Sequence, residues 1–264
     1  MAEMADKHSK PKANDILIEL KSVWKTYDMG HVKVHALKGM DLKVRRDEFI
    51  SVMGPSGSGK STAMNMIGAL DVPTKGTILL DNHDISKLHE SDLAQIRGRK
   101  IGFIFQQFNL INTLTAKENI MLSMMFQGKD EISRMKRAEK LLELVGLADR
   151  MNHKPTELSG GQQQRVAIAR ALANDPEIIL ADEPTGNLDS KSGEIIMEIL
   201  TKLHINEKKT VILVTHDSHV AHHAEKIYLL KDGAIEGIRK IKRQVHSEVL
   251  ARGWDHSLDR EIKR

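Results

Sequence analysis

The sequence predicts an α/β fold built on a mostly parallel β-sheet, and three observations support this prediction. Several short segments are almost entirely apolar, as expected for parallel strands that helices cover on both faces. Segments with amphipathic helical periodicity alternate with these apolar runs. A glycine-rich loop, residues 54–62, separates an apolar segment from a helical one. Helix starts of this kind favour bound anions, because free N–H groups and the helix dipole point toward them.

The first half of the chain is predicted to contain strands, one helix and a hairpin. Residues 1–14 are polar and are expected to be a disordered leader. The segment "ILIEL" alternates apolar and polar residues, which predicts a half-buried strand. The elements predicted after it are strands in "HALKGMDLKV" and "EFISVMG", a helix in "TAMNMIGAL" ending near residues 71–73, and a hairpin in "GTILLDNHDI".

The second half is predicted to hold a helical region between buried strands. The strand "IGFIFQ" precedes residues 108–173, whose pattern is mostly helical. Further strands are predicted in "EIILADEP" and "KTVILVTHD", with the amphipathic helix "SGEIIMEILTKLH" between them. The segment "KIYLLKDG" predicts a hairpin arm. Residues 15–237 are thus expected to form the folded part and residues 238–264 a polar, basic extension.

Composition excludes several classes of protein. The 264 residues suffice for one large domain or two small ones, and the absence of cysteine excludes disulfides and thiolate metal sites. No apolar run approaches the ~18 residues of a membrane helix, so we expect a soluble chain. The net charge of +4 resides in the extension, and the rest is balanced. This offers no support for nucleic-acid binding, which requires a basic face on the folded domain.

The basic residues of the extension raise two possibilities. Arg239, Lys240, Lys242 and Arg243 form a tight cluster that could tether the protein to an anionic membrane surface or to an acidic partner. The alternative is a solvated tail without a role, since charge runs are commonly exposed.

The segment "GPSGSGKS", from Gly54 to Ser61, satisfies the phosphate-loop pattern G-x-x-x-x-G-K-[ST] between a strand and a helix. Its glycines allow the backbone N–H groups to line a concave anion site. Lys60 would contact the β- and γ-phosphates of a nucleotide. Ser61 would offer a hydroxyl to Mg²⁺, which keeps few protein ligands and several waters.

Two acids, Asp182 and Glu183, end the buried strand "IILADE". The carboxyl ends of strands are where α/β proteins bind ligands. Asp182 would hold the Mg²⁺, through water, and Glu183 would act on the attacking water, because phosphoryl transfer depends on a positioned nucleophile.

Three further side chains are weaker candidates when each is considered alone. His216 closes the strand "VILVT" and could contact the γ-phosphate, although a lone histidine there is more often structural. Gln106 ends "IGFIF" and could sense Mg²⁺ and the water, with Gln107 as its competitor. Tyr27 could stack on adenine or could be an ordinary strand aromatic.

A second glycine-rich helix start follows about a hundred residues later, in "LSGGQQQRVAIARAL", and it has no lysine. Together with the phosphate loop and "ILADE", this "LSGGQ" segment resembles the signature of the ATP-binding cassette, the nucleotide-binding subunit of ABC transporters. The resemblance covers about residues 16–237. It implies that two cassettes pair head to tail, and that the signature of one caps the γ-phosphate held by Lys60 of the other.

The resemblance implies a fold, a cofactor set and a set of site residues. It implies a P-loop NTPase core with an N-terminal antiparallel β subdomain and an inserted helical subdomain at about 108–173. Glu183, His216 and Lys60 are the implied catalytic residues, and Ser61, Gln106 and Asp182 the implied Mg²⁺ ligands. The implied ATP contacts are Tyr27, Gly54, Pro55, Ser56, Gly57, Ser58, Gly59, Lys60, Ser61, Thr62, Gln106, Ser159, Gly160, Gly161, Gln162 and Asp189.

The chain departs from the family pattern at two places. Residues 186–189 read Gly-Asn-Leu-Asp where Ser-Ala-Leu-Asp is commoner, which is similar to the macrolide-export and lipoprotein-release type. Asp47 stands where a glycine usually precedes the strand of the phosphate loop, a change that costs little if Asp47 adopts the turn geometry.

The expected function is therefore an ATP-hydrolysing subunit that energises a separately encoded permease at the cytoplasmic side of a membrane. The alternative is a soluble ATPase of the same family without a permease, such as one acting on DNA or ribosomes. A GTPase would show an Asn-Lys-x-Asp motif, which is absent, and a small-molecule kinase would not need "LSGGQ". The cargo is not encoded in this chain.

Overall fold

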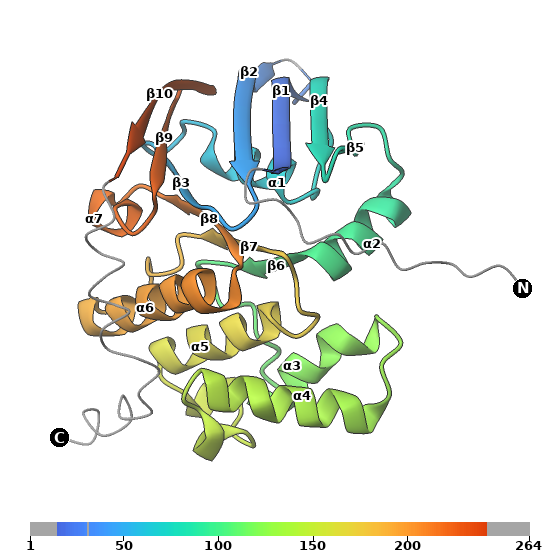
Figure 1. Cartoon of the computed structure of the whole chain (residues 1–264), viewed down its shortest axis with the longest axis vertical. Coiled ribbons are helices and arrows are strands. Elements are labelled where there is room, and N and C mark those ends of the chain that lie inside the picture. Colours follow the sequence, from blue (N-terminus) through green and yellow to red (C-terminus); the bar gives the residue numbers. More distant parts are fainter. Residues whose placement is uncertain (1–14, 31, 242–264) are drawn as a thin grey trace, which may run out of the picture.

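The computed structural model describes residues 15–30 and 32–241, which form two sheets and a helical region (Figure 1). The predicted leader 1–14 lies outside the described residues, as does most of the extension 238–264, including Lys242 and Arg243.

The N-terminal sheet is antiparallel and has the strand order β2-β1-β4-β5. Its strands are β1 (Ile16–Asp28), β2 (Lys33–Arg45), β4 (Lys75–Leu80) and β5 (His83–Asp84). The β4–β5 hairpin was predicted from its sequence. This sheet confirms the expected N-terminal antiparallel β subdomain.

The second sheet has the order β10-β9-β3-β8-β7-β6, and all its pairs are parallel except β10 with β9. Its strands are β3 (Phe49–Met53), β6 (Ile101–Ile104), β7 (Ile178–Asp182), β8 (Thr210–Thr215), β9 (Lys226–Lys231) and β10 (Ala234–Lys240). Because β3, β7 and β8 are parallel neighbours, their carboxyl ends bring residues 54, 183 and 216 to one edge. Strand β10 continues three residues past the expected domain end at 237.

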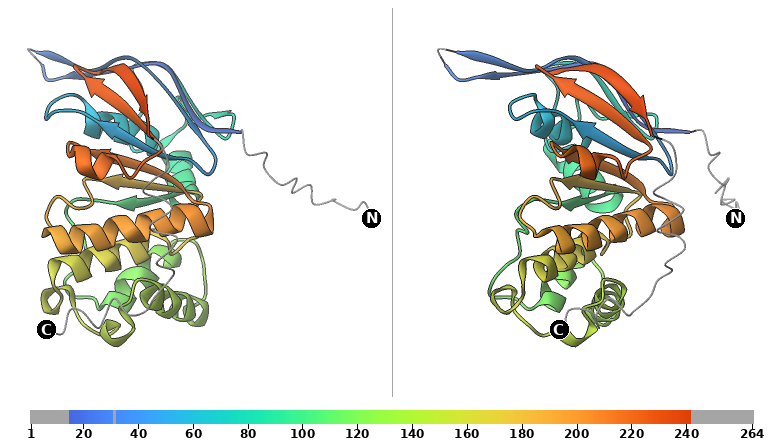
Figure 2. Two further views of the ribbon diagram at one scale, coloured as in Figure 1. Left: turned by 60° about the vertical axis from the view of Figure 1, so that its left-hand side comes forward. Right: turned by 90° about the vertical axis from the view of Figure 1, so that its left-hand side faces the viewer.

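Both faces of this sheet are covered, which explains why its strands are apolar throughout. Phe49, Val211 and Leu213 pack into one core with the helices below the sheet, while Ile50, Val52 and Ile212 pack into a second core on the opposite face. Figure 2 shows the sheet between these layers, with the antiparallel sheet on one side and the helical region on the other.

The helices are α1 (Lys60–Ile67), α2 (Glu90–Lys100), α3 (Ala116–Met125), α4 (Glu131–Leu144), α5 (Gly160–Ala171), α6 (Ser190–Glu207) and α7 (Ser218–Ala221), with short 3₁₀ turns at Ala148–Arg150 and Pro155–Glu157. Helices α3, α4 and α5 form the helical region expected within 108–173. Helix α2 was not predicted, because its sequence is polar and only Leu93 is buried.

Asp47 adopts the turn geometry that its position requires. Its φ is 54°, in the left-handed region that glycine and aspartate tolerate best, and its N–H donates to the Thr210 hydroxyl at 3.1 Å. The loss of the usual glycine is thereby accommodated.

Candidate nucleotide-binding site

The phosphate loop connects β3 to α1, and its glycines are required by geometry. Gly57 and Gly59 have φ of 78° and 101°, values that side chains disfavour. A Cβ on Gly54 would lie 2.1 Å from the carbonyl oxygen of Leu230 in the neighbouring strand β9. The Ser58 carbonyl accepts from Gly233 N at 2.9 Å, so the turn after β9 also holds the loop in place.

Lys60 lies within the curve of this loop and is only 8% exposed. Its ammonium donates to the carbonyls of Gly54 and Pro55, both at 2.9 Å. An ammonium has three N–H donors, so one remains for an anion placed in the loop. The backbone of the phosphate loop therefore holds the lysine side chain in its orientation before a ligand binds.

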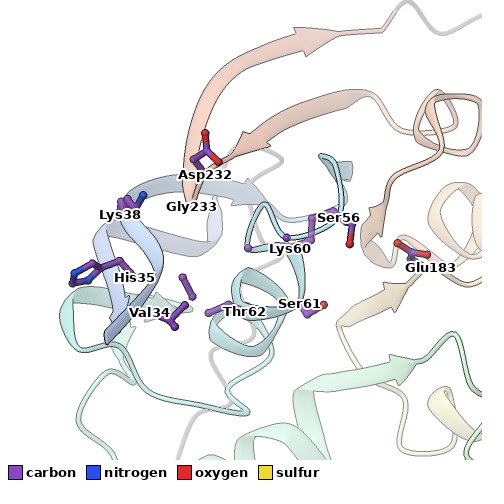
Figure 3. Close-up of a pocket in the computed structure, with 13 residues that line it drawn as sticks. Val34, His35, Lys38, Ser56, Lys60, Ser61, Thr62, Glu183, Asp232 and Gly233 are labelled. Atoms are coloured by element: carbon purple, nitrogen blue, oxygen red, sulfur yellow. The ribbon is translucent and has the colours of Figure 1, made fainter. Parts of the chain in front are cut away.

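A cavity of about 440 Å³ opens beside the loop (Figure 3). This volume lies in the range of small-molecule sites. Its lining comes from the loop and start of α1, from β2, from the β9–β10 turn and from Glu183. The lining residues are Val34, His35, Ala36, Lys38, Ser56, Gly57, Gly59, Lys60, Ser61, Thr62, Glu183, Asp232 and Gly233.

The residues from β2 and from the β9–β10 turn were not identified from sequence. Lys38 N donates to the Gly233 carbonyl at 2.8 Å, which places β2 against the turn that anchors the loop. The "DG" turn signal at Asp232 and Gly233 was visible in sequence, but its proximity to the phosphate loop depends on the strand order β9-β3.

Asp182 and Glu183 follow one another at the end of β7 and differ in environment. Burial raises the pKa of Asp182, the charge of Glu183 raises it further, and Lys60 acts in the opposite direction. A cation beside Asp182 would relieve both causes, and the Ser61 hydroxyl and this carboxylate are oxygen donors of the kind that Mg²⁺ takes. The residues present therefore fit a Mg²⁺ site shared with phosphate.

Glu183 has a φ of 43°, and its N–H donates to the Val214 carbonyl of β8 at 2.8 Å. Its carboxylate Oε1 lies 2.8 Å from Nδ1 of His216, at the end of β8. Two residues predicted separately thus form one hydrogen-bonded pair at the edge of the cavity.

Tyr27 and Gln106 are not among the residues that line the cavity. The Tyr27 hydroxyl donates to Asp71 at 3.2 Å, and Lys25 Nζ lies 5.0 Å from the tyrosine ring centre. Its cross-strand partner Val34 does line the cavity. Gln106 follows β6 and binds Asn187 instead, with Nε2 3.4 Å from Asn187 Oδ1.

The second glycine-rich segment, "LSGGQ", forms the beginning of helix α5. Ser159 is the N-cap: its Oγ accepts from Gln162 N at 3.3 Å, and its N–H donates to Gln162 Oε1 at 2.9 Å. A Cβ on Gly161 would lie 2.9 Å from the Ser192 hydroxyl of α6. Gly161 therefore also permits close packing of α5 on α6.

Asp189 caps α6 in the same way. Its carboxylate accepts from Ser192 N at 3.0 Å and from the Ser192 hydroxyl at 2.7 Å. These hydrogen bonds from Ser192 lower the pKa of Asp189. The starts of α5 and α6 thus meet at Ser192, away from the lining of the cavity described above.

The chain is similar to known proteins in both sequence and fold. Residues 37–186 match the ABC transporter family. An uncharacterised ABC transporter ATP-binding protein of Thermotoga maritima is 53% identical over 85% of this chain and 95% of that protein. The macrolide export ATP-binding/permease protein MacB of Wolinella succinogenes is 51% identical over 83% of this chain but only 34% of that protein.

A solved structure gives the same result. The dimeric post-hydrolysis state of the ATP-binding cassette MJ0796, bound to ADP and Pi, superposes with a TM-score of 0.80 at 52% identity. The match covers 85% of this chain and 99% of that one. The uncharacterised MJ0796 protein of Methanocaldococcus jannaschii is 54% identical in sequence over 86% of this chain.

Proposed function

The chain belongs to the family of ABC transporter ATP-binding proteins and is an ATP hydrolase of that family, and on this premise we propose how its residues act and with which partners. ATP occupies the cavity beside the phosphate loop. The observation that carries this assignment is that Lys60 and Glu183 line the same cavity, with Glu183 hydrogen-bonded to His216.

Each catalytic side chain has a role that follows from its contacts. The loop N–H groups and the free N–H of Lys60 bind the β- and γ-phosphates. Glu183 accepts a hydrogen bond from the attacking water and orients it, while His216 holds the glutamate carboxylate through Nδ1. Ser61, Asp182 and Gln106 hold Mg²⁺, which when bound neutralises charge on the phosphates. Tyr27 stacks on adenine after releasing Asp71.

A second copy of the chain completes the site. Similar cassettes are dimeric in solved structures. We propose a head-to-tail pair in which the capped start of α5, with Ser159, Gly160, Gly161 and Gln162, faces the γ-phosphate bound by the other copy. A helix N-terminus needs no lysine to favour an anion. Asp189 lies at the same interface.

A separately encoded permease is the partner that converts hydrolysis into transport. No helix among residues 15–30 and 32–241 is long and apolar enough to cross a membrane. A groove of about 450 Å³ next to Gln106 is lined by Phe103, Phe105 and Phe126, and Phe126 is 76% exposed. We assign this groove to the permease, at the cytoplasmic side of the membrane. MacB-type relatives suggest export. In this proposal the extension begins after Lys240, where β10 ends.

The substitution Glu183→Gln tests the catalytic assignment. It keeps the shape and removes the base, so we expect ATP binding to persist and turnover to fall at least about 100-fold, within the range of general-base effects. A stable ATP-bound dimer should accumulate on size-exclusion chromatography. Glu143→Gln on the exposed face of α4 is the matched control and should be unaffected. Wild-type hydrolysis in Glu183→Gln would remove Glu183 from this role.

A further inference from the structure

Two loops that lie far apart in the sequence are joined by a pair of amide side chains. Gln106 follows β6 and Asn187 lies in the loop after β7, and these strands are parallel neighbours. Asn187 Nδ2 donates to the backbone carbonyl of Gln106 at 2.9 Å. Gln106 Nε2 donates to Asn187 Oδ1 at 3.4 Å. One asparagine thus contacts both the backbone and the side chain of the same glutamine.

This arrangement determines which end of the Gln106 amide is available to a ligand. A carbonyl accepts hydrogen bonds only, so the Asn187 group facing the Gln106 carbonyl must be Nδ2. The other end of the Asn187 amide is then Oδ1, which accepts only, so Gln106 must present Nε2 to it. The remaining atom, Gln106 Oε1, is left as a free oxygen acceptor suited to a cation or to a water proton.

Gly186 leaves the space that this pair needs. A Cβ on residue 186 would lie 2.8 Å from Gln106 Nε2 and 3.3 Å from Gln106 Cδ. Gly186 N also donates to the Glu183 carbonyl at 3.0 Å, so the turn that carries Asn187 is bonded to the catalytic glutamate. The departure from the commoner Ser-Ala sequence therefore has a structural reason at both positions.

The bases of the same two loops are joined by a buried side chain. Gln164 of α5 is 0% exposed, and its Nε2 donates to the Pro184 carbonyl at 2.7 Å and to the Phe105 carbonyl at 3.3 Å. With the loop bases held together in this way, a change at the Gln106–Asn187 pair alters the glutamine orientation rather than the placement of the loops.

We infer that Asn187 and Gly186 are positioning residues that orient the Gln106 amide with Oε1 toward the ligand. The inference rests on the ATP and Mg²⁺ site proposed above. It assigns a role in this chain to the Gly-Asn pair, which distinguishes it from the commoner family sequence.

A double-mutant cycle tests this role, because it separates an effect through Gln106 from a local structural one. The measurement is the dissociation constant of a non-hydrolysable ATP analogue, in Mg²⁺ and in EDTA. We expect Asn187→Ala and Gly186→Ala each to weaken binding roughly 2- to 10-fold in Mg²⁺, as for one lost hydrogen bond, and not in EDTA. Asn187→Ala should have no further effect in a Gln106→Ala background.

Three results would overturn the inference. These are an equal loss of affinity in EDTA, a full Asn187→Ala effect in the Gln106→Ala background, or no effect of Gln106→Ala on Mg²⁺-dependent binding. Asn152→Ala, an exposed asparagine in another loop, is the matched control and should behave as wild type. Lys60→Ala identifies the separate failure of the ATP site itself: unchanged affinity in EDTA would reject the site and the inference with it, whereas the three results above reject the positioning role alone.

Discussion

Two replacements of Gln164 separate the cost of an empty cavity from the net contribution of the side chain's polar atoms. This side chain is wholly buried, and its Nε2 donates to Pro184 and Phe105. Its Oε1 is buried without a hydrogen-bond partner among the described residues. Gln164→Ala removes the donor, the unpaired oxygen and the volume beyond Cβ. Gln164→Met removes both polar atoms and keeps most of the volume.

The expected free-energy terms make Gln164→Met the more stable of the two variants. Emptying a buried volume of this size costs about 2–5 kcal/mol. Loss of the Gln164 donor leaves the buried Pro184 carbonyl without a hydrogen bond, which costs about 1–3 kcal/mol of stability. Removal of the unpaired, buried Oε1 stabilises the protein by about the same amount. We therefore expect Gln164→Ala to lower the free energy of unfolding by about 2–5 kcal/mol. Gln164→Met should be at least about 2 kcal/mol more stable than Gln164→Ala, since the two polar terms offset each other.

Urea denaturation of the nucleotide-free protein measures both variants, with an unchanged m-value as the control for two-state behaviour. In thermal melts the expected gap between them is about 4–8 °C, for a chain near this size. A methionine variant as unstable as the alanine variant would refute the reasoning, because the two variants differ in filled volume alone and the cavity would then cost nothing.

The remaining predictions address catalysis, the loop and pH. Mixing separately inactive Lys60→Ala and Ser159→Arg proteins should recover about one quarter of the wild-type ATPase rate, since half of the dimers are mixed and each mixed dimer holds one intact site of two. If the mixture is no more active than the separate proteins, the sites are not shared between subunits in a way that lets one intact site hydrolyse ATP alone. Gly54→Ala should lower stability by more than about 3 kcal/mol and abolish nucleotide binding, because its Cβ would meet a backbone carbonyl at 2.1 Å; calorimetric binding like wild type would contradict this. Burial raises the pKa of Asp182 above its ordinary value of 3.8, so its contribution to stability is fully present below that value and is lost as pH rises through the folded-state pKa. In EDTA, Asp182→Asn should therefore gain stability relative to wild type as pH rises above about 4, and a pH-independent difference in urea denaturation would reject this.

The parts of the site that sequence determined are those set by local chemistry. The glycines of the phosphate loop are recognisable in the sequence, because positive φ at Gly57 and close backbone approach at Gly54 exclude other residues. The apolar strands and the helical region were predictable because a doubly covered sheet and an amphipathic helix each impose a periodicity. Helix α2 escaped prediction because it buries only Leu93 and so leaves almost no periodic signal.

Tertiary structure alone decided which of these residues meet. The 2.8 Å contact between Glu183 and His216 and the amide pair of Gln106 with Asn187 join residues 33 and 81 positions apart. Their proximity depends on the register of parallel strands β6, β7 and β8, which follows from the packing of two cores. A residue such as Asn187 carries no local signal of its role, because its partners are a carbonyl and an amide supplied by another loop.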